Sequence, residues 1–299
     1  STPVIDSACK MTVSVVTSAA GLETATPSFR IALGVEYKGS NYHGFQLQAE
    51  GTPSIQGHLE DALQQINNGQ PVRLSCAGRT DAMVHACSQV VHFDTTISRP
   101  MRAWVMGANR YLPKDISVVW AQPMPQDFHS RFSAIARRYR YVIYSDEVRP
   151  AHLSEEVTWT YQTLDVEKMR QAAACLVGTH NFNALRAAGC QAKSPVRTIY
   201  HLQVLEFGKL IIIDVRANAF LHHMVRNIAG VLMMIGGGER PVAWAQQVLE
   251  SRDRTAGGVT AAPHGLYMVG VEYPEQFELP QRYLGPHFLS GLPDILEQA

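Results

Sequence analysis

Segments with the period of a strand alternate with segments with the period of a helix, and this alternation recurs in both halves of the chain. Apolar side chains repeat at every second residue in the strand-like segments and at every third or fourth residue in the helix-like ones. This order predicts an α/β (α+β) protein rather than an all-helical or all-strand one. With 299 residues, of which 46% are hydrophobic, the chain is long enough to bury one large core or two modest ones.

The first half is expected to hold four strands and two helices. The strands are residues 29–37, 72–76, 89–94 and 115–121, and the second helix is residues 100–111. Thr52 and Pro53 provide a cap and a first-turn proline for the first helix, which Asn67-Asn68-Gly69 ends.

The second half repeats this order. Its expected strands are residues 139–144, 196–207, 210–217 and 266–273, and its expected helices are one from the cap Asp165 to Gly178, a long one at 220–235 ended by three glycines, and one at 241–250.

The predicted elements divide the chain into two α/β subdomains, residues 29–135 and residues 136–275. Residues 1–28 are rich in Ser, Thr and Ala and lack the features of a secretory signal, so they are expected to form a disordered arm. Residues 276–299 are expected to form a tail that wraps the surface.

Composition excludes several classes of protein. No stretch approaches the 18 or so apolar residues of a membrane span. The five cysteines form an odd set without a CxxC pair, which argues against a disulfide framework and a cysteine zinc site. A cytoplasmic location is therefore expected.

Basic residues cluster locally although the formal net charge is zero. The clusters are Arg131, Arg137, Arg138 and Arg140; Lys193 and Arg197; and Arg99, Arg102, Arg110 and Lys114. They could form a surface for a polyanion or an ordinary solvated face, and charge alone leaves both interpretations open.

A polar, glycine-marked turn follows the expected strand at residues 72–76 and carries Arg79 and Asp81. In an extended backbone, side chains two residues apart share a face, so both could meet a ligand from one side. The arginine could hold a phosphate and favour an ionised carboxylate, which suits a nucleophile or base. Spacing alone is also compatible with, and rather favours, a surface ion pair in a turn.

This turn resembles the GRTDxGVHA motif of the tRNA pseudouridine synthase A family, and further matches follow in order along residues 29–273. They are Tyr37-Lys38-Gly39, Gly44-Phe45-Gln46, Arg131-Phe132-Ser133-Ala134, Arg138-Tyr139-Arg140-Tyr141, Phe182, Arg186-Ala187, Pro195-Val196-Arg197-Thr198, residues 218–227 and Gly265-Leu266-Tyr267. An ordered series of this kind is far more specific than one short motif.

The resemblance implies that Asp81 is the catalytic nucleophile, that Tyr139 stacks on the target uracil and that Arg226 pairs with the aspartate. The residues it assigns to substrate binding are Tyr139, Arg79, Leu266, Arg131 and Arg138. The sequence supports the pairing independently, because an arginine in the apolar helix at 220–235 is expensive to bury unless it meets a carboxylate.

The resemblance also implies a pseudouridine synthase fold: two similar subdomains, a largely antiparallel extended sheet flanked by helices, and a central cleft. The implied substrate is the anticodon stem-loop of tRNA at positions 38, 39 and 40, from which the uridine is flipped out. A homodimer is implied as well.

No metal and no cofactor are expected. His222 and His223 are neighbours on the expected helix, where side chains diverge by about 100°, so they are not expected to chelate one ion. His85 and His92 lack ligand partners at suitable spacing, and the glycine run at 236–238 is not followed by the Lys-Ser or Lys-Thr of a P-loop.

The chain departs from the family motif at two positions, with Met83 and Ser88 where glycine is common. If position 83 is left-handed, methionine there costs roughly 1–2 kcal/mol. Two alternatives follow for the function: a catalytically impaired tRNA-binding or RNA-folding protein of the same fold, or an unrelated hydrolase. The hydrolase fits poorly, because a glycosidase normally uses two carboxylates and only one is well placed.

Overall fold

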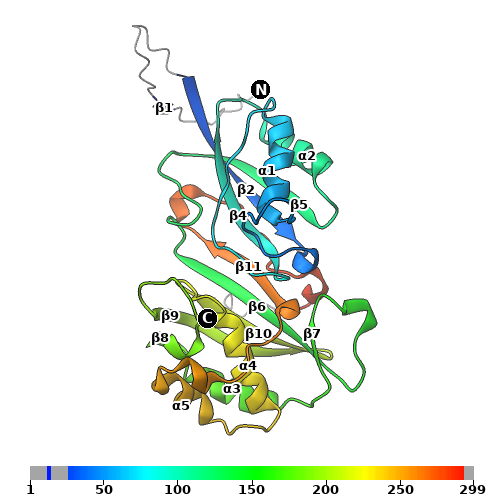
Figure 1. The fold of residues 1–299 in the computed structure, drawn as a ribbon, viewed down its shortest axis with the longest axis vertical. Coiled ribbons are helices and arrows are strands. Elements are labelled where there is room, and N and C mark those ends of the chain that lie inside the picture. The colour runs from blue at the N-terminus through cyan, green and yellow to red at the C-terminus, as the bar shows by residue number, and fades with distance from the viewer. Residues whose placement is uncertain (1–11, 15–25, 293–299) are drawn as a thin grey trace, which may run out of the picture.

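One twisted sheet runs through the computed structural model, which describes residues 12–14 and 26–292 (Figure 1). Its path in the described part of the chain is β1-β2-β4-β11-β6-β10-β9-β8, with β3 beside β4, β5 beside β2 and β7 beside β6. The strands are β1 (Thr12–Ser14), β2 (Thr26–Tyr37), β3 (Ser75–Cys76), β4 (His85–Thr95), β5 (Ile116–Met124), β6 (Ala136–Ser145), β7 (Thr158–Thr160), β8 (Gly178–Asn181), β9 (Val196–Phe207), β10 (Leu210–Ala217) and β11 (Leu266–Glu272). Most neighbours are antiparallel; β11 with β4 and β6 with β7 are parallel.

Five α-helices cover the sheet in two groups within the described residues (Figure 1). They are α1 (Ile55–Ile66), α2 (Met101–Tyr111), α3 (Val166–Ala174), α4 (Met224–Gly236) and α5 (Trp244–Ser251). The expected cap Asp165 accepts a hydrogen bond from Lys168 N, as the sequence predicted for α3. The predicted cap of α1 was wrong, because Ser54 rather than Thr52 accepts from Gly57 N.

The pleat of the strands separates the cores on the two faces of the sheet. Tyr141 and Ile143 of β6 pack with α3, α4 and α5, whereas Val142 between them packs on the opposite face. A further core lies between β2, β4, α1 and α2. Helices thus cover one face, and the chain beyond residue 274 supplies Leu289 and Leu292 to the core on the other.

Strand β11 comes from late in the chain and lies in the middle of the sheet (Figure 1). Tyr267 pairs with His85 of β4, and Leu266 pairs with Tyr141 of β6. Side chains of β11 also join the cores: Leu266 belongs to the core under α3, α4 and α5, and Met268 to the core under α1 and α2. The strand therefore connects the two halves of the molecule.

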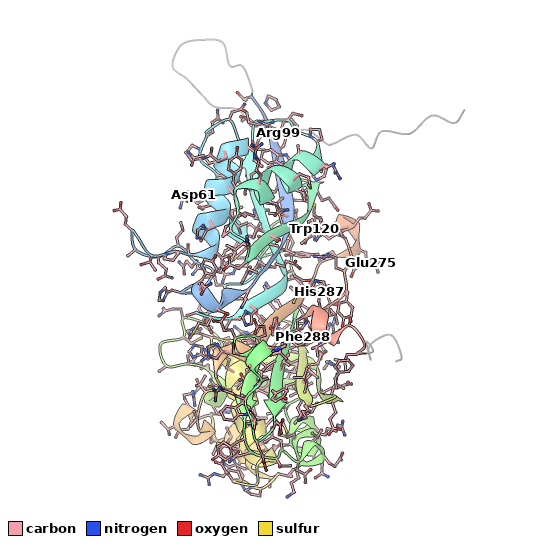
Figure 2. The ribbon with its side chains drawn as sticks, turned by 90° about the vertical axis from the view of Figure 1, so that its right-hand side faces the viewer. Asp61, Arg99, Trp120, Glu275, His287 and Phe288 are labelled. Atoms are coloured by element: carbon pink, nitrogen blue, oxygen red, sulfur yellow. The ribbon has the colours of Figure 1, made fainter. Side chains whose placement is uncertain are left out.

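The segment after β11 runs along the face of the sheet opposite the helices. Figure 2 shows Glu275 beside Trp120 of β5, with His287 and Phe288 further toward the other half of the molecule. A hollow of about 900 Å³ beneath this segment is lined by Trp120 and Glu275. The division that assigns residues 276–299 to a surface-wrapping tail stays a prediction, and residues 293–299 lie outside the described residues.

The expected α/β class with a largely antiparallel sheet flanked by helices is confirmed. Strands 196–207 and 210–217 have the predicted bounds, whereas the helix predicted at 220–235 begins only at Met224. The predicted disordered arm lies largely outside the described residues, but Thr12–Ser14 within it pairs with residues 26–28 as a strand. The division into two subdomains stays a prediction.

None of the helices in residues 12–14 and 26–292 combines the length and the hydropathy that crossing a bilayer requires.

Candidate active site

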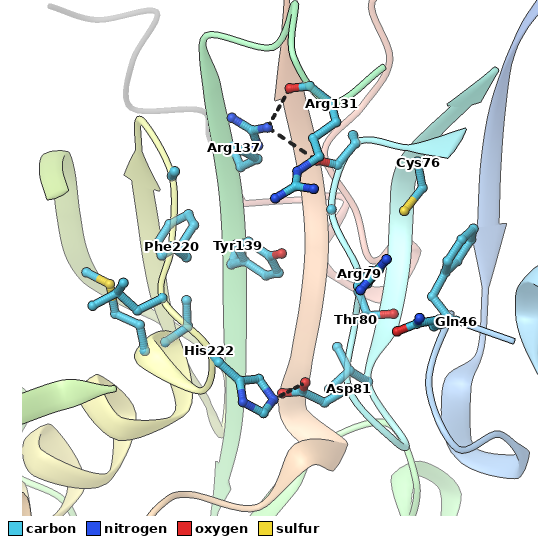
Figure 3. Close-up of a pocket in the computed structure, with 18 of the residues that line it drawn as sticks. Gln46, Cys76, Arg79, Thr80, Asp81, Arg131, Arg137, Tyr139, Phe220 and His222 are labelled. Carbon is cyan, nitrogen blue, oxygen red and sulfur yellow. Dashed lines mark hydrogen bonds and ion pairs between the residues drawn. The ribbon is translucent and has the colours of Figure 1, made fainter. Parts of the chain in front are cut away.

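A cavity of about 850 Å³ opens on the helix-covered side of the sheet and takes its walls from both halves of the chain. Figure 3 shows Asp81 and His222 meeting at one end, Arg131 and Arg137 at the other, and the ring of Tyr139 between them. The cavity therefore joins residues that are far apart in the sequence.

The cavity is strongly cationic although the chain as a whole is formally neutral. Its lining holds a single carboxylate, that of Asp81, and six arginines. The arginines are Arg73, Arg79, Arg131, Arg137, Arg197 and Arg226. A formal charge of +5 over one cavity attracts a polyanion.

Asp81 lies on the loop between β3 and β4, and buried hydrogen bonds hold this loop in shape. The Tyr37 hydroxyl and Thr80 Oγ1 are 2.7 Å apart and share a hydrogen bond. Gln89 Nε2 donates to Gly78 O over 2.7 Å. Because these partners come from β2 and β4, the loop is fixed to the sheet rather than free in solvent.

Two segments that also match the family, those with Gly39 and Gly44, pack closely against this loop because glycine has no Cβ. A Cβ on Gly39 would lie 1.9 Å from Val84 O, and one on Gly44 would lie 2.8 Å from Thr80 O. Gly44 also has φ +100°, which disfavours any other residue. The loop carrying Asp81 is thus packed backbone to backbone.

Asp81 faces three cationic or hydrogen-bonding side chains near the start of α4. His222 Nε2 is 2.9 Å from Oδ1, His223 Nε2 is 3.4 Å from Oδ2, and Arg226 Nη1 is 3.8 Å from Oδ2. The predicted pairing of Arg226 with Asp81 is therefore present, at a long distance. Arg226 is also held by its Nε, which donates to Ala261 O over 2.8 Å.

The structure corrects the reasoning about His222 and His223. Both residues precede α4, and His223 has φ +61°, so the two side chains turn toward one carboxylate instead of diverging around a helix. Their ligand atoms and those of Asp81 lie within 4.8 Å of one another. Two imidazoles and a carboxylate form a donor set that Zn²⁺ accepts, whereas the charge of Arg226 opposes a bound cation.

Tyr139 extends from β6 into the middle of the cavity (Figure 3). Its ring contacts Phe220 edge to face, with centroids 5.0 Å apart. Burial, and then the negative charge of Asp81, raise the pKa of Tyr139, so its hydroxyl is protonated at neutral pH. The exposed part of the ring offers a flat apolar surface to a base.

Of the other predicted substrate contacts, Arg79, Arg131 and Leu266 line the cavity. Arg138 does not, and grouping it with them was a mistake. Successive residues of a strand face opposite sides, so Arg138 lies on the side away from Tyr139. Its Nε and Nη2 donate to the carboxylate of Asp214 over 2.8 and 2.9 Å.

Among the cavity-lining side chains that sequence reasoning did not assign to the site are Phe220, His222, His129 and Phe132. Each lies in or beside a segment of the resemblance, which could have drawn attention to them. No periodicity indicates that His222 meets Asp81, because the backbone turn at His223 interrupts the helical pattern.

A second hollow of about 600 Å³ adjoins the first and shares Arg79, Asp81 and His222 with it. Met83 lines this hollow and is 37% exposed. Its φ is +66°, so the position does adopt the left-handed conformation for which glycine is favoured. Methionine at this position is therefore strained, and its side chain does not line the larger cavity.

Comparisons with known proteins identify the family of this chain. A family model described as tRNA pseudouridine synthase matches residues 34–133 and 172–274. The chain is 64% identical over 282 residues to tRNA pseudouridine synthase A of Pseudomonas aeruginosa, covering 94% of this chain and 99% of that one. It is 56% identical over 261 residues to tRNA pseudouridine synthase A of Pseudoalteromonas atlantica, covering 87% and 98%.

Among solved structures, that of a Cbf5–Nop10–Gar1 complex gives a TM-score of 0.30 at 12% identity, covering 68% of this chain and 53% of that one, a likeness too low to carry an argument.

The fold and the family match define an isomerase of the pseudouridine synthase class. The chain belongs to the tRNA pseudouridine synthase family.

Proposed function

We propose that this protein isomerises uridine to pseudouridine in the anticodon stem-loop of tRNA, at positions 38, 39 and 40, with Asp81 as the nucleophile. The observation that carries the proposal is the single carboxylate in a cavity lined by six arginines. A polyanion is attracted to such a cavity, and the one acidic group is left for chemistry.

The dimensions of the cavity suit an extruded nucleotide. A volume of about 850 Å³ lies in the range of sites that enclose small molecules. A uridine in a stacked arm must leave the stack to reach Asp81, which takes a few kcal/mol. Stacking on Tyr139 and contacts between phosphates and Arg79 or Arg131 offset that energy.

The reaction breaks the bond from uracil N1 to ribose C1′ and forms a bond from C5 to C1′. Between the two steps the base stays bound and rotates, so that C5 takes the place of N1 opposite C1′. No oxidant, reductant or co-reactant enters the balance, and the hydrogen on C5 leaves as a proton. Asp81 provides the carboxylate, and His222 and Arg226 hold it in position. Tyr139 enters the reaction with its hydroxyl protonated, so it can accept the C5 proton only if it transfers its own.

A homodimer in the cytoplasm is part of the same proposal and rests on the family resemblance. Light scattering of the purified protein measures the dimer directly.

The test follows release of tritium from tRNA labelled at uridine C5, because the new C5–C1′ bond must expel that hydrogen. Wild type is expected to release tritium and Asp81→Asn to release none, with tRNA binding retained. The matched control is Asp61→Asn, an exposed carboxylate of α1 outside the cavity, which should react like wild type. Turnover by Asp81→Asn would overturn the role of the aspartate.

The impaired RNA-binding protein remains the second candidate, favoured by the strained Met83 beside Asp81. Binding of tRNA by wild type without tritium release would support it. Met83→Gly should then restore release.

A further inference from the structure

Phe132 stands out among the large apolar side chains because 76% of it is exposed, the highest value among those in the described residues. It lines the arginine-rich cavity at the same end as Arg131. Single exposed apolar residues are common and need no function. The surroundings of this one argue for a function, because they hold the ring in a defined place.

The turn that carries Phe132 is ordered by its own hydrogen bonds. His129 N donates to Ser133 Oγ, and Ser133 N donates to His129 O, each over 2.9 Å. His129 Nδ1 also accepts the backbone N–H groups of Arg131 at 3.1 Å and Phe132 at 3.2 Å. The turn is therefore formed before any ligand arrives, and little order has to be imposed on binding.

The ring of Phe132 continues a stack of aromatic side chains. It lies on His129 with centroids 4.3 Å apart and planes at 30°, and His129 contacts His92 edge to face at 4.6 Å. Burial, and then the charge of Arg30, lower the pKa of His129, so the imidazole is neutral at pH 7. The guanidinium of Arg131 lies 5.5 Å from the Phe132 ring centre.

We propose that Phe132, supported by His129, is a platform on which an unpaired base of the RNA stacks, next in sequence to the extruded uridine, while Arg131 holds the adjoining phosphate. This inference rests on the proposed function. It names the part of the substrate that Phe132 and Arg131 contact, which is a nucleotide outside the RNA helix. An exposed aromatic ring beside an arginine fits an unpaired base and its phosphate, because every base offers a π-face and every linkage a negative charge.

The consequence is a preference for uridines whose neighbour is also free to leave the stack. A uridine inside a continuous duplex presents no such base. The platform thus favours uridines in a loop or in the stem pairs next to it, without reading a sequence.

The test is a double-mutant cycle between the protein and the RNA. Phe132→Ala is combined with tRNA substrates in which the nucleotide 5′ or 3′ of the target uridine is abasic, and Kd, KM and kcat are measured. Loss of one stacked base should weaken binding about 10-fold. Phe132→Ala should raise Kd and KM by this factor on normal tRNA, with kcat unchanged within about twofold, and Phe132→Trp should restore both.

On one of the two abasic substrates, the Kd of wild type should rise by the same factor of about 10. The Kd of Phe132→Ala should be the same for that abasic substrate as for normal tRNA, because the stacked pair is already lost. The matched control is Tyr161→Ala, a 70% exposed aromatic residue that does not line the cavity, which should bind like wild type. Unchanged binding by Phe132→Ala, or abasic effects that simply add to it, would overturn the platform. Tritium release by wild type in the same assay shows that the proposed function stands even then.

Discussion

Neighbouring arginines of β6 face two different environments. Arg137 faces the cavity beside Tyr139, and its guanidinium donates to backbone carbonyls, among them Asn218 O at 3.0 Å and Ala77 O at 3.2 Å. Arg138 and Arg140 face the other side of the sheet, where both contact the same buried carboxylate. The same residue type thus donates to uncharged carbonyl groups on one face and pairs with a carboxylate on the other.

The carboxylate on the far side is that of Asp214, which is fully buried. Arg138 Nε lies 2.8 Å and Arg140 Nε 2.9 Å from its oxygens, and His201 Nε2 lies 3.2 Å away. Burial alone would raise the pKa of Asp214, but His201 and the two arginines outweigh it and hold the pKa well below its usual range. Arg140 also donates to Gly285 O of the tail over 2.8 Å.

The contrast teaches that an arginine-rich segment has no single meaning. On the cavity face, carbonyl oxygens orient Arg137 without cancelling its charge. On the far face, Arg138 and Arg140 pair with the carboxylate of Asp214, and the tail covers this cluster. Four predictions, in order of decreasing effect, separate the stabilising role of the far face from the binding role of the cavity face.

The largest effect is expected from Asp214→Asn. Removing a buried negative charge from between Arg138 and Arg140 should lower the free energy of unfolding by about 3–5 kcal/mol, measured by urea denaturation at pH 7. Pseudouridine formation per folded molecule should stay normal. The control is Asp94→Asn, whose partner Arg30 forms a more exposed pair, with an expected loss of at most about 1 kcal/mol. Equal losses in the two variants would erase the contrast between buried and surface pairs.

The second effect is a loss of stability in acid that originates at the cavity rim. His92 is 4% exposed, burial lowers its pKa to about 4, and its Nδ1 accepts the backbone N–H of Ser130 over 3.1 Å. The pKa of His92 is lower in the folded protein than in the unfolded chain. Neutral His92 therefore contributes fully to the free energy of unfolding above pH 6.5, and this contribution falls as the pH drops toward 4. The expected loss between pH 7 and pH 5 is about 2 kcal/mol.

His92→Asn keeps an acceptor for Ser130 N but does not titrate, so its loss between these pH values should be smaller by that amount. The Asp214 cluster should survive this range, since a depressed carboxylate pKa gives stability above the unfolded value of 3.8 and loses it only below. An identical acid response in wild type and His92→Asn would show that the rim is not the sensitive region.

The third prediction concerns salt. Arg73 is exposed and lines the cavity, so Arg73→Gln should weaken tRNA binding by about five- to tenfold in 0.1 M salt and lower the slope of log K against log salt by about 0.7–0.9. Arg216→Gln is the control, because Arg216 faces the far side and pairs with Glu272. Filter binding over a salt series measures both, and an equal change of slope would remove the distinction between the faces.

The smallest effect is expected at the strained loop of the cavity. Met83→Gly relieves a left-handed conformation that costs about 1–2 kcal/mol, while the added freedom of the unfolded chain takes back about 0.5–1 kcal/mol. The free energy of unfolding should therefore rise by about 0–1.5 kcal/mol. Ala82→Gly, at a position without positive φ, should lower stability by about 0.5–1 kcal/mol. Thermal or urea unfolding of both variants measures the difference.

Much of the fold could be predicted because apolar residues repeat with the period of a strand or a helix wherever one face of the element is buried. Strands β9 and β10 were placed to the residue, since two apolar runs flank Gly208, which has φ +60°. The start of α4 was misplaced because the left-handed turn at His223 has no signal in propensity. The same turn made the geometry around Asp81 unpredictable.

The site itself could be predicted only in part. Asp81, Tyr139 and Arg226 came from resemblance and meet in one cavity, although their roles stay proposals. Arg138 was misjudged because matching a motif ignores the alternation of a strand, which sends its side chain to Asp214. The turn at Phe132 depends on hydrogen bonds to His129 that no local pattern announces.

The central position of β11 bears on the order of events during protein synthesis. The loop with Asp81 and the strand with Tyr139 are translated before Leu266–Glu272, the strand that lies between their two halves of the sheet. Pairing over so great a sequence separation is slow and comes late in folding. A chain translated only as far as β6 therefore carries Asp81 and Tyr139 without the strand that sets the two halves side by side.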